Sequence, residues 1–314
     1  MKAYSGTQFI NPPQESSVIL VTGANGRLGR RIVQHLIARR PLRDAPALAV
    51  SVRQPALAAD LAARGVDVRA GDFDQPETLA ATFAGVRTLV LVSTDGPSAQ
   101  RIAQHAAAIS AARRAGVQRV LYTSFLDVGT DSPAEFARVH RQTEDALAAS
   151  GLDATILRNP LYADDLPALV VPGPDGDAFC LAAGNGAVSL VSRDDLARAL
   201  AAAALAPRLD KRVYELTGSE AVAYAELAAR IARVSGRPLR YLPVTVTEQA
   251  ATLRAAGLSE GLAEGVASLF AAVAEGRLAR VTHDFAALVG HPPRSLDCLI
   301  REYFAPVTAP RTAS

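Results

Sequence analysis

The feature that most constrains this sequence is an apolar run that breaks into three spaced glycines and then continues as a helix. The run covers Val18 to Val21, and the glycines follow in the segment VTGANGRLGRRIVQHL. Glycines at this spacing let the backbone reverse tightly, let a pyrophosphate approach without meeting a Cβ atom, and let the helix lie close to the strand. N–H groups at the helix N-terminus then face the phosphate charge. A strand before and an amphipathic helix after the glycines predict a dinucleotide-binding turn.

Short apolar runs alternate with helical patterns from Val18 onward, which is typical of a parallel sheet with crossover helices. The expected strands span residues 18–22, 47–52, 66–70, 88–93, 119–123 and 154–158. Glycines follow the last turn of the predicted helices, where a left-handed cap is needed, at Gly65, Gly85, Gly116 and Gly151. The sequence therefore predicts an α/β fold with a Rossmann-type, doubly wound parallel sheet.

The pattern changes after Asn159, where Pro and Gly interrupt the chain and later stretches are mostly helical. We expect an NAD(P)-binding Rossmann domain at residues 18–159 and a smaller, discontinuous C-terminal substrate lobe at residues 160–187 and 218–305. Residues 188–217 are expected to return to the first unit, with a strand and a helix between Ser189 and Leu205. Residues 1–17 are expected to form an N-terminal extension and residues 306–314 a tail.

Composition limits the classes of function. Of 314 residues 49% are hydrophobic and the net charge is +2, so no basic surface for nucleic acid is indicated. Cys180 and Cys298 stand far apart without CxxC spacing, and with only five histidines neither a disulfide framework nor a metal site is expected. The first residues lack the apolar core of a signal peptide, and the alanine-rich run at 196–206 is too short to span a bilayer. We therefore expect a protein of the reducing cytoplasm, without a membrane partner.

The end of the second expected strand indicates which dinucleotide binds. NAD-binding units carry an acidic residue there, about 20 residues past the glycines, that accepts hydrogen bonds from the ribose. This strand ends instead in Arg53, whose permanent charge suits the 2′-phosphate of NADPH. The alternative is that Arg53 is one of many arginines on a solvated edge. The expected contacts in the loop itself are Gly23, Asn25, Gly26, Arg27, Leu28 and Gly29.

Several segments carry a resemblance to a known family: TGANGRLG, SVRQP, GDFDQPETLAATFAGV, LVLVS, RAGVQRVLYTS, VHRQTEDALAASGLDATILRN with its HxxxE spacing, and VTHDFAALVGHPP. Together they resemble the NmrA-like atypical short-chain dehydrogenases, and most of all their NAD(P)H:quinone oxidoreductase and triphenylmethane reductase branch. The likeness runs from Val18 to about Phe304. It implies an NAD(P)H-dependent oxidoreductase.

The sequence departs from standard short-chain dehydrogenases at their acid–base pair. These enzymes use Tyr-x-x-x-Lys on the helix after the fifth strand, where the lysine lowers the pKa of the tyrosine. No tyrosine here has a lysine four residues on, and the family pattern places the pair on Phe136 and His140. An acceptor that needs no enzyme acid fits better. A quinone qualifies, because hydride transfer leaves a delocalised hydroquinone anion that water can protonate, and catalysis is then mostly positioning.

The resemblance also implies site residues, each with a structural alternative. His140 is expected beside the nicotinamide ribose or a quinone oxygen, unless it is an ordinary helix histidine. Ser124, at a strand end, is expected to touch nicotinamide or substrate, unless it forms a turn. Asn159 is expected to face the substrate with Tyr162, which otherwise belongs to the core. The expected cofactor contacts beyond the loop are Asp72 and Phe73 at the adenine, and Val92 and Ser93 beneath the cofactor.

A reading of a different class stays open, and a third reading is weaker. NmrA-like proteins include non-enzymatic sensors that bind a dinucleotide and regulate a protein partner, and these also lack the tyrosine and lysine. A sugar epimerase or dehydratase fits less well, because it needs the missing pair. The absence of a phosphate-binding lysine motif and of a GxSxG elbow disfavours nucleotide hydrolysis and serine esterase chemistry.

Overall fold

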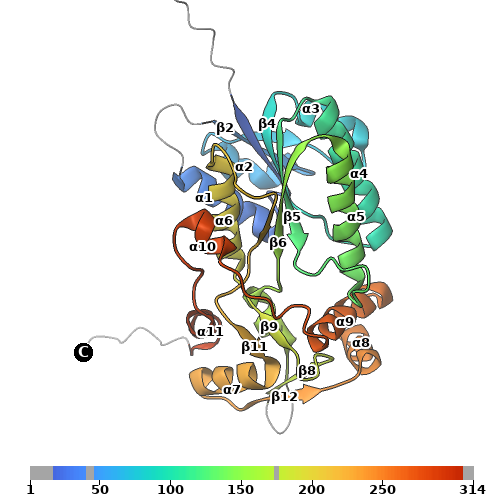
Figure 1. Cartoon of the computed structure of the whole chain (residues 1–314), viewed down its shortest axis with the longest axis vertical. Helices are drawn as coiled ribbons and strands as arrows, with labels where there is room; N and C mark the ends of the chain where they lie inside the picture. The colour runs from blue at the N-terminus through green and yellow to red at the C-terminus, as the bar shows by residue number, and fades with distance from the viewer. Residues whose placement is uncertain (1–16, 40–45, 173–176, 307–314) are drawn as a thin grey trace, which may run out of the picture.

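A seven-stranded sheet forms the centre of the larger lobe (Figure 1). The computed structural model describes residues 17–39, 46–172 and 177–306. The spatial order of the strands is β10-β6-β5-β4-β1-β2-β3, and neighbouring strands are parallel. Their bounds are β1 Val18–Thr22, β2 Ala47–Val52, β3 Asp67–Ala70, β4 Val86–Leu91, β5 Arg119–Phe125, β6 Asp153–Asn159 and β10 Val213–Glu215. The predicted doubly wound parallel sheet is confirmed, and the six predicted strands form within about two residues of their expected bounds.

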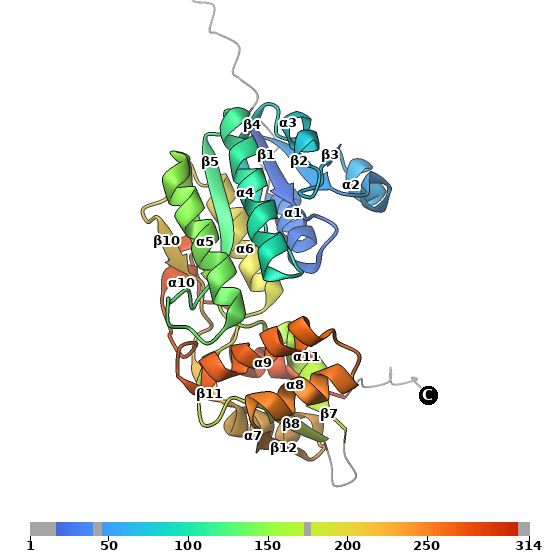
Figure 2. The same cartoon turned by 90° about the vertical axis from the view of Figure 1, so that its right-hand side faces the viewer.

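Helices cover both faces of this sheet, because its strands are apolar on both sides. One face carries α1 (Arg27–Arg39), α2 (Ala59–Ala62), α6 (Arg193–Leu205) and α10 (Asp284–Val289). The other face carries α3 (Leu79–Thr82), α4 (Ser98–Arg114) and α5 (Glu135–Ser150), which stand in front of the sheet in Figure 2. Alternation along β1 sends Ile19 and Val21 into the first layer, and Leu20 into the second.

The smaller lobe lies below the sheet lobe and has its own core (Figure 2). The helices and strands of this lobe are β7 Val170–Val171, β8 Asp177–Leu181, β9 Ala187–Ser189, β11 Ala221–Ala223, α7 Tyr224–Ser235, β12 Leu239–Pro243, α8 Val246–Ala255, α9 Glu260–Ala274 and α11 Leu296–Phe304. The rings of Phe179 and Phe270 both pack edge-on against Tyr224 in this core. Phe125 and Leu126, at the end of β5, belong to the same core. The end of β5 therefore connects the two lobes.

The segment that was expected to return to the sheet lobe does so only in part. Helix α6 packs against α1, and β10 pairs with β6. The strand at the start of the segment, β9, pairs instead with β11 in a separate antiparallel sheet. Val188 of β9 is buried in the core of the smaller lobe, whereas Val191, which follows β9, is buried in the core of the sheet lobe and forms a parallel bridge with Tyr162.

The expected terminal segments lie, apart from Ser17 and Pro306, outside the described residues. Among the residues that the structure describes, no helix combines the length and the apolar character needed to cross a membrane.

The approach of α1 to β1 depends on one glycine. A Cβ atom added at Gly29, in the first turn of α1, would lie 2.3 Å from the carbonyl oxygen of Gly23. That oxygen also accepts a hydrogen bond from the N–H of Gly26, at 2.9 Å. Gly23 itself has a φ of 63°, which favours glycine. The predicted glycine turn therefore holds the helix against the strand.

We expect Gly29→Ala to lower the free energy of unfolding by about 1–3 kcal/mol, because the backbone must shift to admit the methyl group. Urea denaturation followed by circular dichroism measures the change. Gly261→Ala is the matched control, since a Cβ at Gly261 of α9 meets no atom within 4 Å. This control is expected to keep or raise stability. Equal effects of the two substitutions would contradict the close approach.

Candidate active site

The predicted site residues mostly follow the carboxyl ends of the parallel strands. The glycine loop follows β1, Arg53 follows β2, Asp72 and Phe73 follow β3, Val92 and Ser93 follow β4, and Asn159 ends β6. In an open parallel sheet these ends share one edge, and ligands bind there where the strand order reverses. Here the reversal lies between β1 and β4, which are neighbours. The strand order therefore brings the predicted cofactor contacts to one edge of the sheet.

The glycine loop fits a dinucleotide. Gly26 is exposed, and a Cβ there would lie 3.2 Å from the carbonyl oxygen of Gly23. Asn25 and Arg27 are exposed beside it, and α1 begins at Arg27 with its first N–H groups free of helical partners. A Cβ at Gly23 would lie 3.9 Å from the side chain of Val92, so Val92 lies beneath the loop. The loop thus leaves backbone N–H groups and open space where a pyrophosphate binds.

The ends of β2 and β3 form the outer part of the edge. Arg53 is exposed, and the neighbouring backbone is held by Asn25, whose amide donates to the carbonyl oxygen of Gln54 at 3.3 Å. Asp72 is half-buried and accepts the N–H of Asp74 at 3.0 Å, which makes a tight turn after β3. Phe73 is half-buried against the core. These side chains follow two paired strands, and their expected contacts with the adenosine stay a prediction.

A network of buried polar side chains lies behind the end of β4. Arg101, on the first turns of α4, donates from Nη2 to the hydroxyl of Ser93 at 3.0 Å and to Nε2 of His140 at 3.3 Å. The other ring nitrogen of His140, Nδ1, bonds with the hydroxyl of Tyr122 at 2.9 Å. The backbone N–H of Ser93 donates to the hydroxyl of Thr123 at 2.8 Å. The network joins β4, β5, α4 and α5.

The partners of His140 determine its protonation. A guanidinium can only donate, so Nε2 accepts and the ring proton of neutral His140 is on Nδ1, donated to Tyr122. Burial lowers the pKa of His140 well below its usual value, and the charge of Arg101 lowers it further. Burial raises the pKa of the Tyr122 hydroxyl to about 12. Both ring nitrogens of His140 are therefore engaged inside the protein, and the expected direct contact with ribose or quinone is not what the structure shows.

A second histidine in the network is also neutral. Nε2 of His105 accepts the backbone N–H of Thr94 at 3.1 Å, so its proton is on Nδ1 and is donated to Thr143 at 2.8 Å. The hydroxyl of Thr143 donates in turn to the carbonyl oxygen of Val139 at 2.8 Å. Burial lowers the pKa of His105 to about 3, with a smaller effect of the nearby Arg101 charge. Neither histidine supplies a proton at neutral pH.

Ser124 has a hydrogen-bond partner inside the protein. It lies on β5 and is buried, and its hydroxyl donates to Oε1 of Glu144 on α5 at 2.6 Å. The same carboxylate pairs with Arg158 on β6 at 2.7 Å. Strand alternation points Ser124 to α5, the side of Tyr122, and its expected contact with nicotinamide or substrate stays a prediction.

Asn159 and Tyr162 lie together after β6. Asn159 is 2% exposed, and neither its amide nitrogen nor its amide oxygen has a hydrogen-bond partner among the described residues. The guanidinium of Arg193 lies over the Tyr162 ring, with Cζ 4.3 Å from the ring centroid. Burial raises the pKa of the Tyr162 hydroxyl, while the charge of Arg193 opposes the rise. A buried amide without a partner is costly, so Asn159 has unused capacity to bind a ligand.

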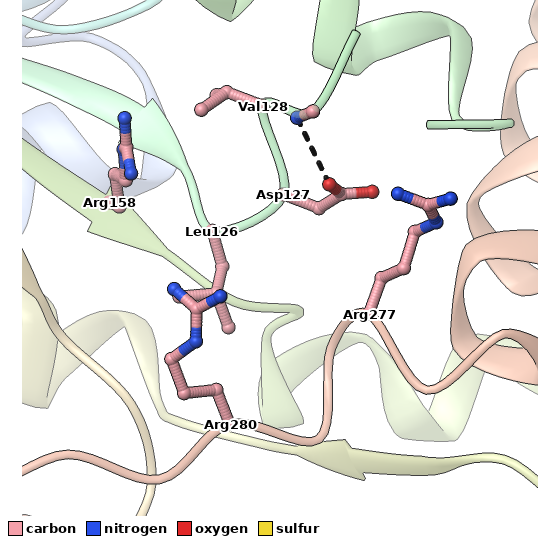
Figure 3. A pocket seen from close by; sticks show the side chains of 7 residues that line it. Leu126, Asp127, Val128, Arg158, Arg277 and Arg280 are labelled. Carbon is pink, nitrogen blue, oxygen red and sulfur yellow. Dashed lines mark hydrogen bonds between the residues drawn. The ribbon is translucent and has the colours of Figure 1, made fainter. Parts of the chain in front are cut away.

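A cavity of about 370 Å³ lies where the loop after β5 meets the segment after α9 (Figure 3). Leu126, Asp127, Val128, Gly129, Arg158, Arg277 and Arg280 line it. Its arginines are already paired with carboxylates: Arg158 with Glu144, Arg277 with Asp131, and Arg280 with Glu215. None of the predicted cofactor contacts lines this cavity. Within the described residues, no group of His, Cys, Asp and Glu side chains is arranged to hold a metal ion.

Sequence reasoning missed Arg101 and Tyr122. The signal for Arg101 was present, because residues 101, 105, 108 and 112 share one face of α4 and the face is apolar or buried at the other positions. An arginine on a buried helix face is unusual. Tyr122 gave no such signal, since a tyrosine within a buried strand is ordinary.

Comparison with known proteins identifies a family and several relatives that resemble this chain. The sequence profile of the NAD(P)H-binding family matches residues 23–207. Quinone oxidoreductase 2 of Escherichia coli is 35% identical over 279 residues, which cover 89% of this chain and 96% of that protein. Its solved complex with NADPH superposes with a TM-score of 0.82 at 34% identity, over 91% of this chain and 99% of that one.

Two further relatives agree. Triphenylmethane reductase of Citrobacter, solved with NADP(H), has a TM-score of 0.81 and 33% identity over 91% of this chain and 99% of that one. An NmrA-like family domain-containing oxidoreductase of Aspergillus flavus is 31% identical over 284 residues, 87% of this chain and 91% of that protein. The likeness spans both lobes in each case.

The neutral histidines predict how stability depends on pH. Because the pKa of His105 is near 3 when folded and about 6.5 when unfolded, the unfolded chain binds more protons between these values. The contribution of the neutral histidine to the free energy of unfolding is fully present above pH 6.5. It decreases as the pH falls toward 3, by at most about 1.4 kcal/mol per pH unit for each histidine. Urea denaturation at a series of pH values measures this slope. His105→Gln should flatten it, and the exposed His283→Gln should not; equal slopes in all three proteins would contradict the assignment.

Proposed function

The chain belongs to the NmrA-like, NAD(P)H-binding family of oxidoreductases, and we propose that it transfers hydride from NADPH to a quinone or a similar flat acceptor. One observation carries the proposal. The helix that holds the tyrosine and lysine of standard short-chain dehydrogenases presents Phe136 and a buried, neutral His140 with both nitrogens bonded. An acceptor that requires an enzyme acid therefore finds none there.

NADPH, when bound, supplies the hydride. In this proposal the glycine loop from Gly23 to Gly29 binds the pyrophosphate, and Arg53 binds the 2′-phosphate. Arg27, which in the structure pairs with Asp165 at 3.5 Å, joins Arg53 when the phosphate is bound. Asp72 and Phe73 lie along the adenine, and Val92 and Ser93 lie beneath the nicotinamide end. The exposed backbone N–H groups after β1 and the exposed guanidinium after β2 support these assignments.

The acceptor is placed by the groups after β6 and by the smaller lobe. Asn159 offers an amide with no protein partner, which suits a carbonyl oxygen of the acceptor. Tyr162 lies beside it and forms one wall. His140 and Ser124 take revised roles: each holds another side chain in place, His140 through Arg101 and Ser124 through Glu144. The relatives named for quinone and triphenylmethane substrates support a flat acceptor.

Arg53→Ala is expected to weaken NADPH binding by roughly tenfold to a hundredfold while leaving NADH binding unchanged, because a charge-assisted hydrogen bond contributes about 1.5–3 kcal/mol. Titration calorimetry with both dinucleotides measures the two dissociation constants. Arg64→Ala removes an exposed arginine of the same lobe and serves as control. Similar affinities of the unsubstituted protein for NADPH and NADH would contradict the assignment of NADPH.

Turnover is expected with benzoquinones, naphthoquinones or triphenylmethane dyes, followed as loss of nicotinamide absorbance. Asn159→Ala should lower kcat/KM for the best acceptor by about tenfold or more without loss of stability, because it removes a bond to substrate and an unpaired buried amide. Tight NADPH binding without oxidation of NADPH by any acceptor would contradict the enzyme proposal and favour a dinucleotide sensor.

A further inference from the structure

Arg101 is a buried cation whose hydrogen-bond partners are neutral, while the carboxylates of Asp95 and Glu135 act on it only from a distance. Arg101 is only 6% exposed. Its hydrogen bonds go to the hydroxyl of Ser93 and to neutral His140, and its guanidinium lies 5.4 Å from the ring centroid of Phe136. Its Nε is buried without a partner in the described part of the chain, and no acceptor there bonds with Nη1. The guanidinium thus keeps unused donors beside the end of β4.

Three other partly buried arginines pair with carboxylates, and a fourth, Arg119, donates from both terminal nitrogens to the backbone carbonyl oxygens of Ala206 and Ala204. Arg158 pairs with Glu144 at 2.7 Å, Arg193 with Asp165 at 2.7 Å, and Arg294 with Asp195 at 3.1 Å. These carboxylates help to raise the arginine pKa values above their usual range. Arg101 forms no ion pair with any described carboxylate, and burial lowers its pKa. A buried charge without a counter-ion costs several kcal/mol in stability, so its presence calls for a negative partner.

The position of Arg101 indicates which ligand supplies that partner. The pyrophosphate and 2′-phosphate of the dinucleotide belong to the glycine loop and Arg53, after β1 and β2. Arg101 instead contacts groups after β4 and on α5, and its charge acts on the hydroxyl of Tyr162 after β6. This is the side of the switch point where the acceptor is placed by Asn159. The partner is therefore an oxygen of the acceptor.

We propose that Arg101 is a catalytic residue that binds the acceptor oxygen on which negative charge develops during hydride transfer. The inference rests on the proposed function and names its substrate class: acceptors whose reduced form is an oxyanion. The C–H bond of the dihydronicotinamide breaks as its hydride bonds to one carbonyl oxygen of the quinone, and an electron pair moves to the other oxygen. The products are NADP⁺ and the hydroquinone monoanion, which takes one proton from water. Arg101 donates a hydrogen bond to this oxygen and keeps its own proton.

His140 acts here as a positioning residue. Its neutral Nε2 accepts a hydrogen bond from Arg101 and leaves the positive charge on the guanidinium. The hydrogen bond between Nδ1 and Tyr122 fixes the ring on the other side. A protonated histidine at this place would repel the guanidinium. The buried network therefore holds one permanent positive charge in a fixed direction, which is the arrangement that stabilises a developing anion without reorganisation.

Three proteins test the proposal: Arg101→Gln, Arg101→Lys, and Arg113→Gln as a control that removes an exposed arginine of the same helix. With 1,4-naphthoquinone and NADPH, kcat/KM should fall about a hundredfold in Arg101→Gln, less in Arg101→Lys, and not in the control. The dissociation constant of NADPH should stay unchanged in all three. The urea midpoint of Arg101→Gln should be equal to or above that of the unsubstituted protein.

A binding measurement needs no turnover. The probe is 2-hydroxy-1,4-naphthoquinone, which is an enolate anion near neutral pH, compared with neutral 1,4-naphthoquinone. On the protein loaded with NADP⁺, the enolate should bind at least tenfold more weakly to Arg101→Gln, while the neutral quinone changes little. Unchanged enolate affinity, a loss of NADPH affinity, or a lowered urea midpoint in Arg101→Gln would each overturn the role of Arg101. Failure of the unsubstituted protein to reduce any quinone would overturn the proposed function instead, and enolate binding would still decide the contact with Arg101.

Discussion

The contact between Gly29 and the carbonyl of Gly23 is the constraint on which the cofactor side of the molecule depends. Since the two backbones touch, α1 starts directly above the end of β1, and its free N–H groups point along the sheet edge. Val92 then lies beneath the same turn, which brings the end of β4 to the cofactor. Any larger residue at position 29 would move the helix away and open the loop. Dinucleotide binding therefore follows from backbone packing more than from any charged side chain.

The acceptor side is built on a different principle. There the end of β4, β5, α4 and α5 are joined by side chains that are polar yet buried, and the two histidines among them are neutral. Such a network cannot deliver a proton, but it can hold Arg101 and Ser93 rigidly. Asn159 adds a second set of unused hydrogen-bonding atoms nearby. The site is thus suited to holding an acceptor and stabilising charge on it, and poorly suited to acid catalysis.

Local sequence patterns were enough to predict the sheet and its ligand edge. Apolar runs separated by helical stretches gave the strands, and the glycine spacing gave the cofactor turn, because both depend on residues close in sequence. The pairing of β9 with β11 could not be predicted, since a three-residue strand carries no signal for its partner. The bonds of His140 depend on how α4 packs against α5, which brings together residues 39 positions apart. The side of the sheet to which Ser124 points could have been predicted, because residues 122 and 124 of one strand point to the same side and Tyr122 is buried.

In the proposed reaction, hydride reaches the acceptor without a proton from the enzyme. Single-turnover oxidation of NADPH by a quinone, measured in H₂O and in D₂O and with NADPH deuterated at the transferred position, tests it most directly. We predict that the rate falls with deuterated NADPH and is the same in the two solvents. A rate that falls in D₂O, together with a loss of activity as an enzyme acid is deprotonated at higher pH, would contradict it.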